Sequence, residues 1–157
     1  MSRYAFPMLD PAPTTKIDPT LARGRLEEII DETATTPAYV VLSFPNTNYR
    51  THLIPAGGVE GLRDRLGKTV IGRISAKARR VDKVGAGGRY IEPVIGRPRR
   101  VQGSVVATDT GKNTITVSAG APITSSLTDP RQKASDFTPG DFVSFDVERG
   151  ASFTLGE

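Results

Sequence analysis

The chain has 157 residues, which is the usual length of a single domain. It has no cysteine and one histidine, His52, so disulfides, thiolate metal sites, a cysteine nucleophile and any site with two histidine ligands are excluded. Hydrophobic residues make up 37% of it, and 21 Lys and Arg stand against 17 Asp and Glu, which describes a basic globular protein. The 16 glycines and 12 prolines favour many turns and a β-rich fold.

Residues 1–17 are predicted to form an extended arm. Pro7, Pro11 and Pro13 disfavour regular structure there, and the aromatic and aliphatic side chains between them favour docking on a neighbouring surface. This segment lacks the apolar core of a secretory signal, and no run of about 20 apolar residues, as a membrane-spanning helix requires, occurs in the sequence. We therefore expect a cytoplasmic protein with no membrane segment, and the absence of cysteine agrees with a reducing compartment.

A helix is predicted over residues 19–33. Asp18 is suited to the N-cap, and Pro19 is suited to the first helical position. Apolar residues then recur at the three- and four-residue spacing of a helix face. The helix is expected to end before Pro37.

The rest of the chain alternates between strands and turns. Residues 39–44 and 49–54 are rich in β-branched and aromatic residues and flank a Pro-Asn-Thr-Asn turn, so they predict a hairpin. A short helical turn is predicted at 59–66, and small apolar residues alternate with basic ones in a strand at 68–79. Further strands are expected at 89–95, 101–108, 113–119, 143–147 and 153–155, and the long connection at 120–139 contains a short strand at 123–126.

These elements favour a mainly β fold. We expect a small closed or half-closed antiparallel β-barrel with an N-terminal helix and one short helical turn, because closure removes exposed strand edges. The rhythm of strand and turn in residues 101–147 resembles that of OB barrels. The predicted organisation is one barrel domain over residues 18–157, preceded by the extended arm.

Basic charge is concentrated in one quarter of the chain. Residues 61–100 hold 12 basic and 3 acidic side chains, whereas both flanking segments are net acidic. A basic β-hairpin over residues 73–100 is therefore the candidate site for DNA or RNA phosphates, since each neutralised phosphate releases a counterion. Alternatively, these side chains contact acidic surface on another subunit or form a solvated sheet face. The candidate residues are Arg73, Lys77, Arg79, Arg80, Lys83, Arg89, Arg97, Arg99 and Arg100.

One segment of this hairpin, Gly96-Arg97-Pro98-Arg99-Arg100, resembles the basic core of an AT-hook, which inserts arginines into the narrow minor groove of A·T-rich DNA. The likeness covers five residues, and isoleucine precedes them where an AT-hook has arginine. The alternative is a bend between two strands whose arginines face solvent. Tyr90 is the one aromatic residue of the hairpin, so a stacking platform for single strands is poorly represented.

No catalytic constellation is apparent in the sequence. The chain has no Gly-x-Ser-x-Gly nucleophile elbow, and His52 has no acidic neighbour in the sequence. Asp141, Asp146 and Glu148 could bind a hard cation, but they lack the spacing of a calcium loop. We therefore predict a non-catalytic binding module with no cofactor and no metal. The alternative is a structural or self-assembling protein, a homo-oligomer whose subunits touch through the arm, the helix and the hairpin.

Overall fold

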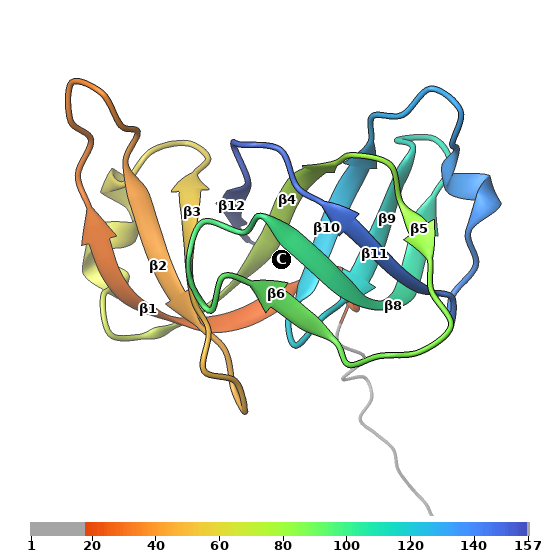
Figure 1. Cartoon of the computed structure of the whole chain (residues 1–157). Coiled ribbons are helices and arrows are strands. Elements are labelled where there is room, and N and C mark those ends of the chain that lie inside the picture. Colours follow the sequence, from red (N-terminus) through yellow and green to blue (C-terminus); the bar gives the residue numbers. More distant parts are fainter. Residues whose placement is uncertain (1–17, 157) are drawn as a thin grey trace, which may run out of the picture.

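The computed structural model describes residues 18–156, and strands make up 49% of it (Figure 1). The predicted arm, residues 1–17, lies outside the described part. Within residues 18–156 the structure has two short 3-10 helices, η1 (Glu60–Arg65) and η2 (Ala134–Asp136). The strands are β1 (Ala22–Ile30), β2 (Tyr39–Ser43), β3 (Arg50–Pro55), β4 (Thr69–Ala78), β5 (Asp82–Lys83), β6 (Tyr90–Glu92), β7 (Ile95–Gly96), β8 (Arg100–Asp109), β9 (Thr114–Ser118), β10 (Pro122–Leu127), β11 (Phe142–Asp146) and β12 (Ser152–Leu155). The mainly β fold predicted from the sequence is confirmed.

The helix predicted over residues 19–33 is wrong, because this segment contains strand β1. Ala22, Gly24 and Leu26 are buried and the residues between them are exposed, which is the alternation of a strand. Apolar residues four positions apart fit a strand as well as a helix, and this ambiguity misled the prediction. A β-bulge between Leu26 and Glu28 then shifts the alternation.

Two neighbouring strands hold this segment extended, since β1 pairs antiparallel with both β2 and β4. A Cβ atom on Gly24 would lie 2.8 Å from the carbonyl oxygen of Ser43, so the close approach of β1 to β2 requires glycine. Asp18, predicted as a helix cap, accepts hydrogen bonds from the amide and the hydroxyl of Thr20 at 2.8 and 2.7 Å. It therefore closes a turn that precedes the strand.

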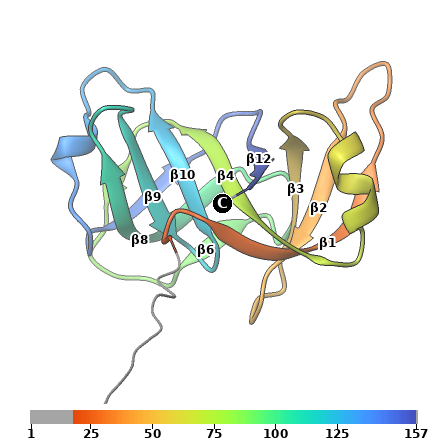
Figure 2. The same ribbon diagram turned by 180° about the vertical axis from the view of Figure 1, so that it is seen from behind.

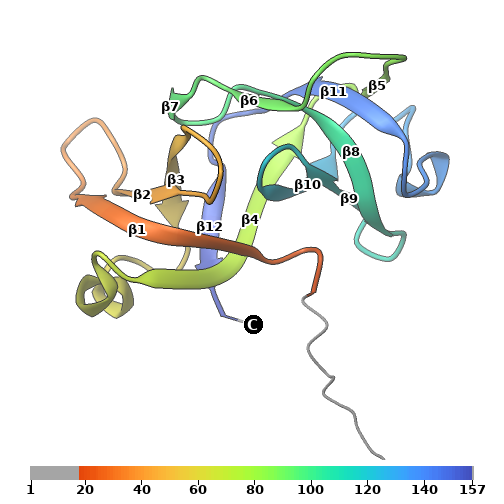
Figure 3. The same ribbon diagram turned by 90° about the horizontal axis from the view of Figure 1, so that it is seen from below.

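Five strands close into a barrel, so of the predicted closed and half-closed alternatives the closed one is confirmed (Figure 3). The expected antiparallel pairing does not hold throughout, because β12 runs parallel to β3. β1, β2 and β3 form an antiparallel meander, β12 pairs in parallel with β3 and antiparallel with β4, and β4 returns to β1. Leu62 of η1 belongs to the hydrophobic cluster that fills the structure. The inward side chains of this first barrel include Leu26, Val40, Leu42, Leu53, Ile74 and Phe153.

A second ring of strands begins on the far half of β4 (Figures 1 and 2). This half pairs in parallel with β10, and β10, β9, β8 and β11 follow one another antiparallel. The chain after β11 then returns to β4 at a bridge between Ala78 and Val147. Because β12 belongs to the first barrel, the second ring is an insertion between β4 and β12 in sequence.

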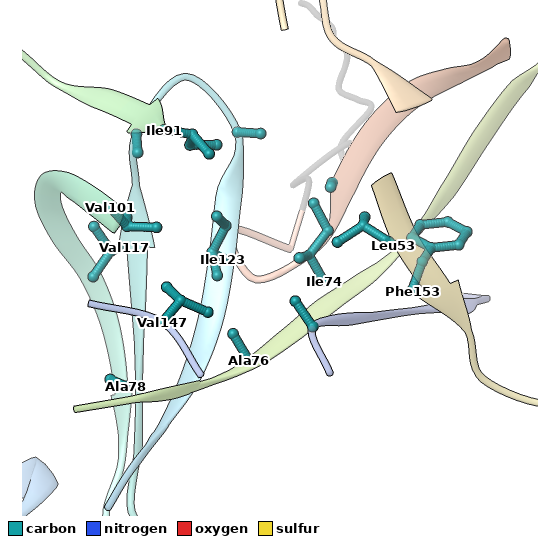
Figure 4. Packing of buried hydrophobic residues seen from close by; sticks show 14 of the residues in the cluster. Leu53, Ile74, Ala76, Ala78, Ile91, Val101, Val117, Ile123, Val147 and Phe153 are labelled. Carbon is teal, nitrogen blue, oxygen red and sulfur yellow. The ribbon is translucent and has the colours of Figure 1, made fainter. Parts of the chain in front are cut away.

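The two rings share one hydrophobic core. Figure 4 shows Leu53 and Phe153 of the first barrel on one side and Val101 and Val117 of the second ring on the other, with Ile123 facing the shared strand β4. All of them belong to a single buried cluster. The rings therefore stabilise one another through β4.

The other predicted strands are mostly confirmed. Strands occupy the predicted hairpins and the predicted segments near the C-terminus, and η1 occupies the predicted helical turn. The strand predicted at 89–95 is instead split into β6 and β7, which pair with β8 and β3 on different sides of a bend at Pro93. The connection at 120–139 carries β10 and η2. Neither 3-10 helix within residues 18–156 has the length and apolar content needed to span a bilayer.

Candidate functional site

The two arms of the basic hairpin predicted over residues 73–100 do not pair with each other. β4 pairs with β1, β10 and β12, while β6 pairs with β8 and β7 with β3. Local alternation identified the strands correctly but could not identify their partners. The predicted residues are therefore distributed over β4 and the turn after it, β5, the segment before β6, the bend before β8 and the first residue of β8: Arg73, Lys77, Arg79, Arg80, Lys83, Arg89, Arg97, Arg99 and Arg100.

Arg100 is neutralised by strand β11. Its guanidinium donates to the Asp146 carboxylate at 2.8 Å and to the Ser144 hydroxyl at 2.7 Å. The hydrogen bond to Asp146 is the main cause that raises the pKa of Arg100. This arginine is therefore occupied by a contact within the fold, and it is less available to an external phosphate.

Two further basic residues also have acidic partners. Arg80 forms an ion pair with Asp82 at 3.1 Å, and the Lys83 ammonium lies 3.5 Å from the Asp141 carboxylate. The pKa of Asp141 is lowered, first by the hydrogen bond from the amide of Thr138 and then by the charge of Lys83. Arg80 thus faces an acid of its own segment, and Lys83 faces one that lies 58 positions further along the chain.

Lys77 and Arg79 lie opposite acidic residues at the end of β11 and just after it, on either side of the bridge between Ala78 and Val147. The Arg79 amide donates to the Asp146 carbonyl at 2.9 Å, and the Glu148 amide donates to the Lys77 carbonyl at 2.9 Å. Residues directly opposite on antiparallel strands have side chains on the same face. Lys77 and Arg79 therefore each have an acidic cross-strand neighbour, which weakens the positive electrostatic potential at the protein surface.

Three arginines form a cluster without such compensation. We call Arg97, Arg99 and Arg149 the arginine cluster. Among residues 18–156 none of them forms an ion pair. Partial burial lowers the pKa of Arg97, and the positive charges of Arg99 and Arg149 lower it further. Arg97 is therefore repelled by the positive charges of Arg99 and Arg149, and an anion bound beside it would relieve that repulsion.

Backbone contacts bring this cluster together across 50 residues of sequence. The Arg99 amide donates to the Glu92 carbonyl at 2.7 Å, and the Val147 amide donates to the Arg99 carbonyl at 2.9 Å. Pro98 is buried, so the bend that carries Arg97 and Arg99 packs against the barrel. Arg149 follows two residues after Val147. Sequence analysis missed it because it lies outside the basic segment, and only strand pairing places it there.

An aromatic pair lies beside the arginine cluster. Tyr39 on β2 and His52 on β3 have ring centroids 5.9 Å apart and ring planes inclined by 54°. Their neighbours Val40 and Leu53 are fully buried in the barrel, so the two rings project from its outer face. Arg97 directly follows Gly96 of β7, which pairs with Thr51 of β3, so the cluster begins beside the strand that carries His52. Tyr39 raises the pKa of Arg97, against the lowering by burial and by the two arginines. Sequence analysis treated His52 as an isolated strand residue and found no aromatic partner for the arginines.

Strand β7 extends this outer face with apolar side chains. It pairs in parallel with β3, with Ile95 beside Arg50, as the close approach of the two strands in Figure 3 illustrates. Ile95 is 64% exposed and Val94 is 48% exposed, and both are large apolar residues. Since Arg50 and His52 share one face of β3, Ile95 lies on the same face as the aromatic pair.

A separate polar groove of about 480 Å³ lies over the outer faces of β4, β9 and β10. Hydroxyl groups form its floor, and those of Thr116 and Thr124 are hydrogen-bonded at 2.8 Å. Arg73 lines one wall, where it donates to the Thr20 hydroxyl at 3.1 Å. Figure 2 shows these strands from the side on which β9 and β10 are in front. No aromatic ring lines this groove.

The described residues hold no group of three or more His, Asp or Glu side chains arranged to bind a metal ion. Asp146, considered above as a cation ligand, is paired with Arg100. The chain matches no protein-family model, no curated protein and no solved structure. The chemistry of the arginine cluster and the aromatic pair is therefore the basis for assigning a function.

Proposed function

We propose that this protein is a non-catalytic module that binds nucleic acid, with the arginine cluster in contact with phosphates. The observation that carries the proposal is the gathering of Arg97, Arg99 and Arg149 with no ion pair among residues 18–156. Arginine donates to phosphate oxygens in a bidentate geometry. Uncompensated positive charge also attracts polyanions and gains free energy from the counterions that they release.

The strand order of the first barrel supports an OB-like assignment. OB barrels combine an antiparallel meander of three strands with a fifth strand that pairs in parallel with the third, and β1, β2, β3 and β12 have this relationship. OB folds bind oligonucleotides over the face of their second and third strands. The corresponding strands are β2 and β3, which carry the aromatic pair beside the arginine cluster. This likeness of fold is an analogy and adds to the argument from charge.

The site we propose is smaller than the predicted hairpin. Arg97 and Arg99 are its centre, and Arg149 joins them. Lys77, Arg79 and Arg89 contribute only to the long-range field. We propose phosphate contacts rather than insertion of an AT-hook into the minor groove, because buried Pro98 and the hydrogen bond of the Arg99 amide hold this segment in the fold. A cytoplasmic location, as expected from the cysteine-free sequence, is part of the same proposal.

The test is fluorescence anisotropy with labelled DNA and RNA at about 50 and 200 mM salt. Replacing Arg97, Arg99 and Arg149 by Gln is expected to weaken binding and to reduce the salt slope by about 0.7 to 0.9 for each lost phosphate contact. The control replaces Arg23, Arg63 and Arg131, which removes the same charge from exposed positions outside the cluster. No binding at low salt, or equal losses in both triple variants, would overturn the proposal.

One observation favours subunit contact as the second candidate. Val94 and Ile95 are exposed apolar neighbours of the arginine cluster, and such side chains mark protein interfaces when they are contiguous. A homo-oligomer that uses this face would dissociate when both become Ser. Light scattering after size-exclusion chromatography measures the mass of the assembly, and a monomer in the unchanged protein would reject this candidate.

A further inference from the structure

We propose that the site selects single-stranded polynucleotide, with bases stacked on Tyr39 and His52 and phosphates on the arginine cluster. This inference rests on the proposed function and deepens it by naming the class of nucleic acid. It applies to single-stranded DNA and RNA, which share the exposed base faces that stacking requires.

The first argument is the placement of the two rings. Tyr39 and His52 come from adjacent strands and are both partly exposed on the outer face of the barrel. Their planes are inclined by 54° at a centroid distance of 5.9 Å, so the rings do not cover each other face to face. A flat base can therefore lie against a ring, which is the contact that single-strand binding proteins use.

The second argument is the width of the face. β2, β3 and β7 are hydrogen-bonded neighbours. Their register places Tyr39, His52 and Ile95 on a diagonal that spans about 10 Å across the strands and about 13 Å along them. Other sheets with aromatic side chains on the surface stack two or three bases. Ile95, at 64% exposure, provides apolar surface for a base at one end of this row.

The third argument is the position of the charge. Arg97 directly follows β7, whose Gly96 pairs with Thr51 beside His52. The Arg99 carbonyl accepts a hydrogen bond of 2.9 Å from the Val147 amide, two residues before Arg149. Phosphates of a strand whose bases cover the rings would thus be near guanidinium groups. A duplex offers a higher density of phosphate but keeps its bases stacked inside, so it can use the arginines and not the rings.

The experiment compares oligo-dT, oligo-U and a DNA duplex of equal length at one salt concentration. We expect both single strands to bind more tightly than the duplex. Tyr39→Ala should weaken single-strand binding by about 5- to 150-fold, the effect of losing one stacked base, with the salt slope unchanged. Tyr39→Phe keeps the ring and should bind within about twofold of the unchanged protein. His52→Phe is expected to retain binding for the same reason, and His52→Ala to weaken it.

The outcomes separate the two proposals. If the duplex binds as tightly as single strands, or if Tyr39→Ala binds like Tyr39→Phe, the stacking inference is overturned while the arginine-dependent function stands. If no nucleic acid binds, both proposals are overturned. A difference between oligo-dT and oligo-U would identify which polymer the site prefers. Circular dichroism of each variant shows whether a loss of binding reflects a loss of fold. If an alanine variant unfolds, Tyr39→Phe and His52→Phe still test the inference, because weakened binding by either would contradict stacking on the rings.

Discussion

The hydroxyl of Tyr49 donates a hydrogen bond of 2.9 Å to the carbonyl oxygen of Ala119, 70 residues further along the chain. The same hydroxyl accepts a hydrogen bond of 3.0 Å from the amide of Ile91. Tyr49 belongs to the loop before β3, whereas Ala119 follows β9 and Ile91 lies on β6. One phenol group therefore links the first barrel to the second ring and to strand β6.

We expect Tyr49→Phe to destabilise the protein by about 1–3 kcal/mol, because it leaves the buried partners of the hydroxyl unsatisfied. Urea unfolding followed by circular dichroism measures the change. Tyr39→Phe is the matched control, since no hydrogen bond of the Tyr39 hydroxyl is present among the residues described, and its stability should change little. Similar unfolding curves for the two variants would show that the Tyr49 hydroxyl does not link the rings.

Gly72 lies on β4 at the point where strand β12 comes closest to it. A Cβ atom there would collide with the carbonyl oxygen of Thr154 and the ring of Phe153. Gly72→Ala should therefore destabilise the protein by roughly 1–3 kcal/mol or prevent folding. Gly61→Ala is the control, because open space surrounds the corresponding position in η1. Equal yields and unfolding midpoints would contradict the close packing of β12 on β4.

Asp129 provides a prediction of pH dependence. Hydrogen bonds from Arg131 lower the pKa of Asp129 from 3.8 to about 2. Because the pKa of this carboxyl is lower in the folded state, its contribution to stability is present above the unfolded value and is lost as pH falls through about 2. Arg131→Gln should raise the midpoint of an NMR titration, while the amide of residue 131 keeps it below 3.8. An unchanged midpoint would assign the shift to another group.

Ser125 is fully buried in the second ring, and its hydroxyl has no hydrogen-bond partner among residues 18–156. Removing a polar atom that makes no hydrogen bond removes its desolvation cost. We expect Ser125→Ala to leave stability unchanged or to raise it by about 1 kcal/mol. Thr124→Val is the contrasting variant, because it breaks the bond to Thr116 and should destabilise. Thermal unfolding of both variants decides the matter, and a large loss in Ser125→Ala would reveal a partner such as a bound water.

Parts of the candidate site could be recognised from the sequence and parts could not. Arg97 and Arg99 lie in a basic segment, and a bend there was one of two predicted alternatives. Arg149 lies in an acidic segment and carries no local signal. Tyr39 and His52 lie on the two strands of one predicted hairpin, so their proximity could have been predicted. Nothing in the sequence places them beside Arg97.

The amino-acid sequence alone specifies the turns, the mainly β fold and the alternation of most strands, because these depend on residues a few positions apart. It determined β4 as a strand with one apolar and one basic face. The tertiary structure decided that residues 22–30 form a strand, since pairing with β2 and β4 outweighs an ambiguous apolar spacing. It also decided which arginines remain uncompensated, because ion pairs such as Arg100 with Asp146 join residues 46 positions apart. Such partners are selected by strand pairing across the whole chain, which no local pattern encodes.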